Sequence, residues 1–244
     1  MQNRLSIVIP MFNEAERIEK VLDRVWAASR STGWGHEIIL VDDGSSDDGV
    51  ARARRWMERI PAAQRDAVIL LLQPENQGKW SAVRRGYRQA SGDVILVQDA
   101  DLELDPAQYP QLLEPFSDPR VHVVYGVRSL PTEAYPWAFR MANHVLNGLT
   151  SCLFLTKVGD METAYKALRR EVAASMELEA CHFEGEPEVT AKILRQGYRI
   201  REVPVSYLPR NRQEGKKVRF RDGFQAVVEL LRWRLVPKAW WVLR

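Results

Sequence analysis

Short apolar runs alternate with helical patterns through the first hundred residues of the chain. The runs are mostly β-branched and lie at 5–9, 37–41, 67–72 and 94–97. Runs of this length and composition are typical of strands buried on both faces of a parallel sheet. The first strand is expected to stop at Pro10, with Asn13 capping a helix that starts near Glu14. The order β-α-β-α-β-α-β predicts a doubly wound, mostly parallel, Rossmann-like α/β sheet.

The second half of the chain continues the pattern less regularly. Three further strands are predicted at 121–125, 165–168 and 199–207, the last an edge strand because it contains Pro204. Helical patterns cover 135–154, 186–196 and 220–235, and Gly197 is placed to end the second of them. We find no internal repeat and no low-complexity linker, and the length of 244 residues fits one large α/β domain or two small ones.

Carboxylates follow the fourth predicted strand at every second position. Asp99, Asp101 and Glu103 come directly after the run 94–97. Ligands of open α/β sheets lie at the carboxyl ends of strands, and hard divalent cations prefer oxygen ligands shared with water and phosphate. A solvated acidic loop that caps the helix after Pro106 explains the spacing equally well, so both interpretations stay open at this point.

Two other strand ends carry polar residues of the kind that bind nucleotides. Asp42 and Asp43 precede Gly44 and a predicted helix, although Ser46 or Asp47 alone would suffice as a helix cap. After the third strand, Gly78 and Lys79 open a helix. Glycine there lets phosphate oxygens approach free N–H groups, and the lysine adds positive charge. This second signal is weak alone, because the chain has neither a Walker P-loop nor GxGxxG.

Charge is distributed unevenly along the 244 residues. The net charge is +3, but residues 210–244 hold ten Lys/Arg and three Asp/Glu, a local charge of +7. A basic end indicates an anionic partner such as phosphate, lipid headgroups or nucleic acid. Two cysteines cannot build a disulfide framework, and four scattered histidines show no zinc-site spacing. We expect neither a signal peptide nor a transmembrane helix, because the chain starts directly in a strand and has no apolar run of 18 residues.

Several motifs occur in a fixed order, and together they resemble a known enzyme family. They are VIPMFNE (8–14), VDDGSSD (41–47), NQGKWSAVRRG (76–86), QDADLELDP (98–106), GDMETAYKALRR (159–170), EPEVTAKILRQGYRIREVPVSYLPR (186–210) and EGKKVRFRDG (214–223). The chain closely resembles the family 2 glycosyltransferases with the GT-A fold. The nearest branch is the polyprenyl-phosphate sugar transferases, such as the dolichyl-phosphate mannosyl- and glucosyltransferases.

The resemblance implies a domain organisation. Residues 1–209 would form the GT-A catalytic domain, with a nucleotide-binding half at 1–105 and an acceptor half at 106–209. Residues 210–244 would add a basic loop and an amphipathic C-terminal helix, an acceptor-side extension within the same domain.

The resemblance also implies roles for residues at the donor site. Base and ribose would contact Pro10, Glu14, Asp42 and Asp43. A divalent cation, Mg²⁺ or Mn²⁺, would bind the donor diphosphate through Asp99 and Asp101, with Glu103 close by. Arg210 and Lys216 resemble basic residues of a mobile loop that closes over the donor phosphates.

On the acceptor side, the resemblance implies that Arg128 faces a phosphate, and Arg140 is a second candidate. Segment 183–188 reads FEGEPE where the branch usually has a glycine-aromatic pair at 184–185, and its usual C-terminal membrane helices are absent. Both departures concern the acceptor more than the chemistry. Asp160 or Glu162 could act as a base if the acceptor is a hydroxyl.

The chemistry implied is inverting transfer of a sugar from a nucleotide-diphosphate sugar to a polyprenyl phosphate. The motif sequences QDADLELDP and DMETAYK resemble the glucosyl-type branch, which favours UDP-glucose as the donor, with GDP-mannose next. An anionic phosphate nucleophile needs little base assistance, so the lack of a catalytic histidine is no objection. Alternatives are a soluble or hydroxyl acceptor, a DxD phosphatase, or a nucleic-acid binder built on the basic tail. The phosphatase would need a second Asp where Ala164 stands, and no nucleic-acid module surrounds the tail, so we expect no nucleic-acid partner.

The C-terminal helix carries an apolar stripe beside basic residues. The stripe consists of Phe220, Phe224, Val227, Val228, Leu231 and Leu235. Trp240 and Trp241 follow, and such a combination suits a lipid interface. The alternative is that the stripe packs on the protein's own sheet. The first interpretation predicts a cytoplasmic protein, peripheral at the inner face of a membrane.

Overall fold

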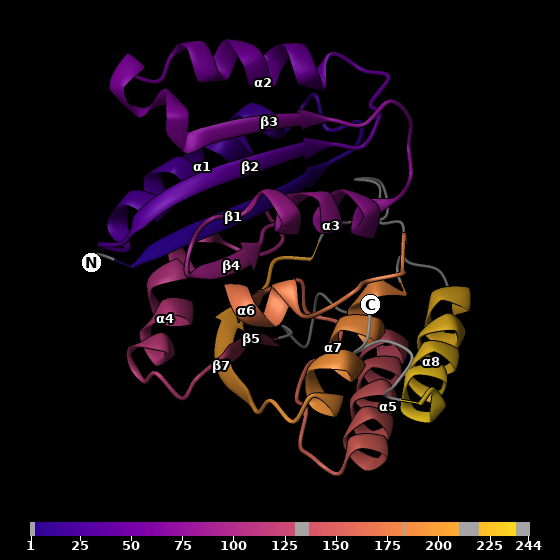
Figure 1. Ribbon diagram of the computed structural model, residues 1–244. Helices are drawn as coiled ribbons and strands as arrows, with labels where there is room; N and C mark the ends of the chain where they lie inside the picture. Colours follow the sequence, from indigo (N-terminus) through magenta and orange to yellow (C-terminus); the bar gives the residue numbers. More distant parts are fainter. Residues whose placement is uncertain (1–2, 130–136, 183, 210–219, 238–244) are drawn as a thin grey trace.

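A computed structural model describes residues 3–129, 137–182, 184–209 and 220–237 of the chain (Figure 1). Its centre is a sheet of seven strands in the order β3-β2-β1-β4-β6-β5-β7. The strands are β1 (Arg4–Met11), β2 (Gly35–Asp42), β3 (Val68–Leu72), β4 (Val94–Val97), β5 (Val123–Ser129), β6 (Lys166–Arg169) and β7 (Ile200–Ser206). All seven lie within four residues of the predicted limits at either end, and β4 coincides with its prediction.

Six strands of the sheet run in one direction. The pairs β1–β2, β1–β4, β2–β3 and β5–β7 are parallel, whereas β6 is antiparallel to both β4 and β5. The predicted mostly parallel α/β sheet is therefore confirmed. β7 is an edge strand, as Pro204 indicated, because it pairs with β5 alone. One sheet contains strands from both predicted halves of the domain, and the division into halves stays a prediction.

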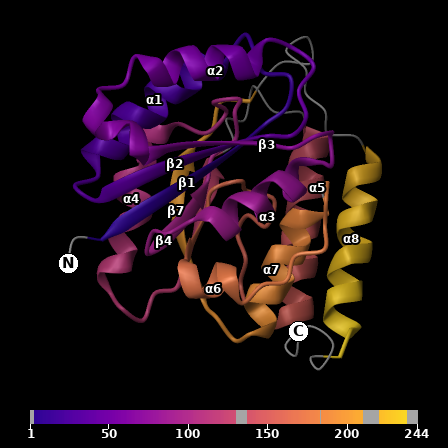
Figure 2. The ribbon, with the colours of Figure 1, turned by 45° about the horizontal axis from the view of Figure 1, so that its top comes forward.

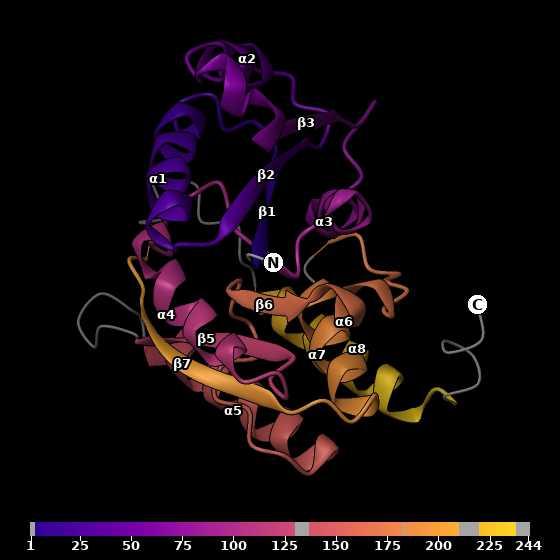
Figure 3. The same cartoon turned by 60° about the vertical axis from the view of Figure 1, so that its left-hand side comes forward.

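Helices cover both faces of the sheet. One face carries α1 (Ile18–Ser31), α2 (Gly49–Glu58) and α4 (Tyr109–Leu113), and the other carries α3 (Lys79–Gln89), α6 (Arg170–Ala174) and α7 (Gly185–Arg195). Figure 3 shows α1 and α3 on opposite sides of β1 and β2. Short 3-10 helices lie at η1 (Ala62–Ala67), η2 (Pro106–Gln108) and η3 (Glu114–Ser117). Two separate apolar cores result, one on each face, and they hold the strand ends in place.

Two longer helices lie outside these layers. The helices α5 (Trp137–Phe154) and α8 (Phe220–Leu235) pack against each other and against α7 (Figure 2). The buried face of α8 consists of Ala226, Leu230 and Trp233. Most of the predicted apolar stripe is exposed instead, so the alternative in which it packs on the protein's own sheet is not observed in the described part of α8. No helix in the described segments combines the length and the hydropathy that crossing a bilayer requires.

The start of the first helix differs from the prediction. β1 continues through Pro10 to Met11, and α1 begins only at Ile18 with no side-chain cap. Asn13 has a positive φ of 54° and does not cap α1. Its side chain accepts a hydrogen bond from the Ser46 amide instead (2.9 Å), so this residue connects two loops at the carboxyl edge of the sheet.

Candidate active site

The carboxyl ends of β1, β2 and β4 bring three of the predicted motifs to one edge of the sheet. Pro10 lies in β1, paired in register with Val41 of β2. The loops that follow β1 and β2 are joined by further hydrogen bonds: Ser45 Oγ accepts from the Asn13 amide and Asp47 accepts from the Ala15 amide, both at 2.9 Å. The motif at 8–14, including Glu14, is thereby held against the motif at 41–47.

The two aspartates at the end of β2 are both buried but have different surroundings. Asp42 accepts one hydrogen bond, from the Ser45 amide to Oδ2 (3.1 Å), while its buried Oδ1 has no partner among the described residues. Asp43 accepts from the amides of Gln77 (2.9 Å) and Gly78 (2.8 Å) and from the Gln73 side chain. Asp43 therefore stabilises the turn before α3, whereas Oδ1 of Asp42 is available to accept a hydrogen bond from a ligand.

The turn before α3 is shaped by Gly78, which has a φ of +96°. A Cβ at this position would collide with the Cys181 carbonyl and the His182 ring. The Gly78 amide donates to Asp43 and the Trp80 amide donates to the Cys181 carbonyl (2.9 Å). These two N–H groups are therefore engaged within the protein, and phosphate binding at this turn stays a prediction. The positive charge of Lys79 is the feature of this turn that faces the site.

The turn after β4 that contains Asp99 and Asp101, here called the DxD turn, is supported by Gln98. This buried residue was not among the predicted site residues. Its amide nitrogen donates to the Asp99 carbonyl (3.0 Å), and its oxygen accepts from the hydroxyls of Tyr109 (2.8 Å) and Tyr165 (2.7 Å). The only sequence signal for Gln98 was a polar side chain directly before the two aspartates. Its supporting role could not be predicted, because it depends on Tyr109 and Tyr165, which are distant in the chain.

The three carboxylates of this turn point to different partners. Asp99 forms an ion pair with Lys79 (2.8 Å), Asp101 accepts from the Glu103 amide (3.0 Å), and Glu103 accepts from the Tyr207 hydroxyl (2.6 Å). Among the described residues no group of three or more His, Cys, Asp or Glu gathers as a metal site. The predicted convergence of all three carboxylates on one cation is therefore not found.

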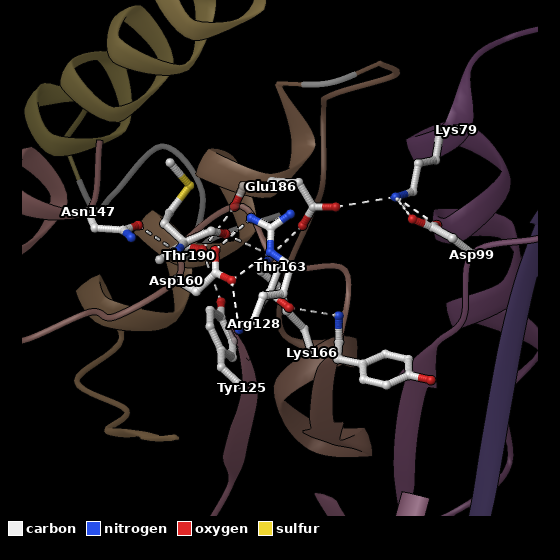
Figure 4. A network of polar contacts seen from close by, with 12 residues as sticks. Lys79, Asp99, Tyr125, Arg128, Asn147, Asp160, Thr163, Lys166, Glu186 and Thr190 are labelled. Atoms are coloured by element: carbon white, nitrogen blue, oxygen red, sulfur yellow. Dashed lines mark hydrogen bonds and ion pairs between the residues drawn. The ribbon is translucent and has the colours of Figure 1, made fainter. Parts of the chain in front are cut away.

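A chain of ion pairs leads from the DxD turn into the second half of the chain (Figure 4). Lys79 contacts Glu186 on α7 (3.4 Å) as well as Asp99, and Glu186 forms a second, buried ion pair with Lys166 of β6. Glu186 and Lys166 both stand in predicted motifs, but neither was predicted as a site residue. Neither has a local pattern that reveals it, because α7 reaches this position only through the tertiary fold.

Arg128 near the end of β5 forms a bidentate ion pair with Asp160. Its Nε and a terminal nitrogen donate to the two carboxylate oxygens of Asp160 at 2.7 and 2.8 Å, and the Arg128 amide donates to the same carboxylate at 3.1 Å. The guanidinium also lies over the Tyr207 ring, 5.2 Å from its centre. The structure thus brings these two predicted residues together, with Asp160 orienting Arg128. A carboxylate occupied in this way is a poor general base.

Glu162, the other predicted base, is partly buried beside charged side chains. Burial raises the pKa of its carboxyl to about 7, and Glu186 adds to that increase while Lys166 and Arg128 oppose it. Its Oε1 atom is buried without a hydrogen-bond partner among the described residues. Strongly perturbed carboxyls of this kind concentrate at functional sites.

Some predicted residues cannot be compared with the structure. Arg210 and Lys216 lie outside the described residues, as do Trp240 and Trp241. Arg140 lies on α5 and is half-buried. The last described residues before 210 do approach the DxD turn, because the Leu208 amide donates to the Glu103 carbonyl (2.9 Å).

Comparison with known proteins identifies the family. Residues 6–176 match the family model described as "Glycosyl transferase family 2". The chain belongs to glycosyl transferase family 2. The resemblance to this family, drawn from the motifs, is thereby confirmed, and with it the phosphatase and nucleic-acid alternatives lose their support.

Curated relatives fall in the polyprenyl-phosphate branch. The chain is 33% identical over 214 residues to the undecaprenyl-phosphate 4-deoxy-4-formamido-L-arabinose transferase of Edwardsiella ictaluri, covering 87% of this chain and 62% of the relative. It is 34% identical over 178 residues to the transferase of the same name from Yersinia pestis, covering 71% and 51%. The chain therefore spans between about half and three-fifths of the length of these two relatives.

Solved structures with the same fold are also found. Glucosyl-3-phosphoglycerate synthase of Mycobacterium tuberculosis, in complex with phosphoglyceric acid, superimposes with a TM-score of 0.73 at 20% identity, covering 97% of this chain and 82% of that one. The same enzyme with Mn²⁺, UDP-glucose and phosphoglyceric acid superimposes with a TM-score of 0.72 at 20% identity, covering 97% and 81%. This likeness confirms the GT-A fold, and at such identity it shows the fold alone.

Proposed function

We propose that this protein is an inverting glycosyltransferase that moves a sugar, with UDP-glucose the favoured donor, to a polyprenyl phosphate. One observation carries the proposal: Asp99 and Asp101, Asp42 with its unpartnered oxygen, and Arg128 all belong to strand ends or loops of the same sheet. The names of the curated relatives support a polyprenyl-phosphate acceptor. The solved neighbour with UDP-glucose supports a UDP-sugar donor in this fold.

The surroundings of Asp42 support a uridine rather than a guanosine donor. One oxygen of its carboxylate is already used by Ser45, and one buried oxygen is available. Uracil presents a single N–H donor on its pairing edge, whereas guanine presents an N–H and an amino group, which together suit a carboxylate with both oxygens available. GDP-mannose is therefore the second choice.

A thermal-shift assay tests the donor assignment. We expect UDP with Mn²⁺ to raise the melting temperature of the wild type more than GDP with Mn²⁺ does. Asp42→Asn should lose most of the UDP effect, because the amide places a donor or a weaker acceptor against the base. Equal stabilisation of the wild type by GDP and UDP would contradict the assignment.

The residues of the DxD turn suit a cation that the donor diphosphate helps to hold. Asp99 already faces a cation, the Lys79 ammonium, and both aspartates supply hard oxygen ligands. Protein carboxylates alone do not complete such a site here, so diphosphate and water would have to supply the remaining ligands. When bound, Mg²⁺ or Mn²⁺ would supply Lewis-acid stabilisation of the leaving diphosphate.

The protein's own residues have separate parts in the transfer. Lys79 places positive charge beside the leaving diphosphate. Arg128, oriented by Asp160, would hold the acceptor phosphate for in-line attack of its oxygen on the anomeric carbon. The nucleophile is already anionic, so Asp160 can remain bound to Arg128 throughout. In-line displacement inverts the anomeric configuration.

The outer helices would bring the site to its lipid acceptor. The exposed apolar side chains Trp137, Met141 and Val145 lie on α5, at a spacing of four residues, and Phe224, Val228, Leu231 and Leu235 lie on α8. Exposed Arg232 and Arg234 are on the same helix. Apolar side chains beside basic ones favour docking on an anionic membrane surface. Asn147 of α5 also bonds the Gly159 carbonyl (2.6 Å), next to Asp160, so the docking helix is connected to the acceptor side of the site.

A further inference from the structure

The Glu162 carboxyl differs from its acidic neighbours in having a buried oxygen without a partner. Asp160 uses both of its oxygens on Arg128, and Glu186 uses both of its oxygens on Lys79 and Lys166. Oε1 of Glu162 has no hydrogen-bond partner in the described part of the chain. Leaving a buried polar atom unsatisfied is unfavourable, so such an atom in a site indicates a bond that a ligand completes.

The backbone at Glu162 is fixed on both sides. The Lys166 ammonium donates to the carbonyls of Met161 (2.9 Å) and Thr163, the two residues that flank Glu162. The Met161 amide donates to the Asn147 side chain (2.9 Å). These bonds place Glu162 within a rigid segment, as a preorganised binding group requires.

Within the described ranges, the charged neighbours of Glu162 form ion pairs with each other and not with Glu162. Arg128 from β5 is paired with Asp160, and Lys166 from β6 is paired with Glu186 from α7. Glu162 adds a further carboxylate to these two neutral pairs. Burial, Glu186 and Asp160 raise its pKa to about 7 against the opposing effect of the two cations, so the carboxyl readily keeps a proton near neutral pH.

We propose that Glu162 contacts the acceptor phosphate as a neutral carboxylic acid and donates a hydrogen bond to a phosphate oxygen that does not attack. This inference rests on the proposed polyprenyl-phosphate acceptor. A phosphate monoester carries between one and two negative charges near pH 7. An ionised Glu162 would repel this phosphate, whereas the protonated form adds a hydrogen-bond donor to the site that contains Arg128.

The proton stays on Glu162 during the reaction. An electron pair of a different phosphate oxygen forms the bond to the anomeric carbon, and the bond to the nucleoside diphosphate breaks with its electrons leaving on the diphosphate. The step requires no base, so Glu162 acts in binding the acceptor and not in removing a proton. This assignment differs from the general-base role expected for a hydroxyl acceptor.

The pH dependence of Glu162→Gln tests the inference, because the amide keeps a hydrogen-bond donor but cannot ionise. Acceptor kcat/KM of the wild type should fall by about tenfold per pH unit above pH 7, the slope of a single ionisation. The Gln variant should retain activity and show no such fall up to pH 9. The matched control is Glu171→Gln, which changes an exposed carboxylate on α6 and should keep the wild-type profile.

Four outcomes would overturn the inference. A Gln variant with the same falling profile would show that another group titrates, and a Gln variant that folds but is inactive at every pH would indicate an ionised base. A wild-type kcat/KM that does not change between pH 6 and 9 would contradict it without any variant. If the wild type transferred no sugar to polyprenyl phosphate at any pH, the proposed acceptor would fail, and this inference with it.

Discussion

At the scale of single residues, the carboxylates of the site divide into those that build it and those that remain for substrate. Asp43 and Asp160 are occupied by the Gln77–Gly78 turn and by Arg128. Asp42 and Glu162 each keep a buried oxygen without a partner among the described residues. Removing a carboxylate of the first kind should disturb the fold or its neighbour, whereas removing one of the second kind should change substrate binding.

Asp101→Asn should reduce kcat by at least about 100-fold while leaving the melting temperature unchanged. The amide oxygen can still accept from the Glu103 amide, so the turn should persist, but the negative charge that a cation needs is lost. Steady-state kinetics at saturating Mn²⁺ is the measurement. Asp105→Asn is the matched control, because that carboxylate, in the same loop, pairs with Arg24 at 2.8 Å. Full activity of the Asp101 variant would remove this residue from the metal site.

Residues that are adjacent in sequence to a strand end could be predicted, and residues recruited from elsewhere could not. Asp42, Asp99 and Asp101 follow apolar runs, so their arrival at one edge of the sheet follows from parallel pairing. Glu186 and Lys166 lie 20 residues apart in the chain, and the tertiary fold brings the start of α7 to the first residue of β6. No periodicity encodes that contact. Arg128 and Asp160 were each predicted as site residues, but their ion pair was not predicted.

At the scale of elements, the turn that starts α3 connects Asp43, at the end of β2, to the chain of ion pairs that begins at Lys79. Gly78 adopts a positive φ between the Asp43 carboxylate and the Cys181 carbonyl, and Lys79 follows it directly. The position of the Lys79 ammonium therefore depends on the backbone conformation of one glycine.

Gly78→Ala should lower the free energy of unfolding by about 2 kcal/mol or more, because the new Cβ meets both positive-φ strain and a backbone carbonyl. Urea denaturation measures the change. The control is Gly148→Ala on α5, where a Cβ meets nothing within 4 Å and the substitution should stabilise by up to about 1 kcal/mol. A Gly78 variant with the wild-type midpoint would show that the turn tolerates a side chain.

The positions of strands and helices could be predicted, but the direction of β6 and the packing of α8 could not. A four-residue run such as Lys166–Arg169 has the same composition whether it runs parallel or antiparallel to its neighbours. In α8 the apolar residues extend around much of the helix, so periodicity alone did not show which side packs. Ala226, Leu230 and Trp233 face α5 and α7 because a small residue and an indole fit that interface.

At the scale of the whole molecule, α5 and α8 form an outer layer whose exposed side chains are largely apolar. Phe224, Leu235 and Trp137 are each more than 70% exposed. Single exposed apolar residues are common on protein surfaces, but several on two neighbouring helices form a patch, and such a patch indicates an interaction surface.

Phe224→Ser combined with Leu231→Ser should weaken binding to anionic liposomes by at least about tenfold, since apolar side chains supply much of the affinity of interfacial helices. Co-sedimentation is the measurement, and binding of the wild type should weaken as salt rises. Leu72→Ser, an exposed apolar residue at the end of β3, is the control and should bind normally. Equal sedimentation of the double variant and the wild type would exclude this surface from membrane docking.

The most direct test of the proposed function is sugar transfer to a polyprenyl phosphate in anionic liposomes, with UDP-glucose and Mn²⁺. We expect a glucosyl phosphate lipid of inverted anomeric configuration, formed faster than the product of GDP-mannose and not formed when the metal is chelated. Turnover of UDP-glucose only with a soluble or hydroxyl acceptor, or undiminished transfer after chelation, would contradict it.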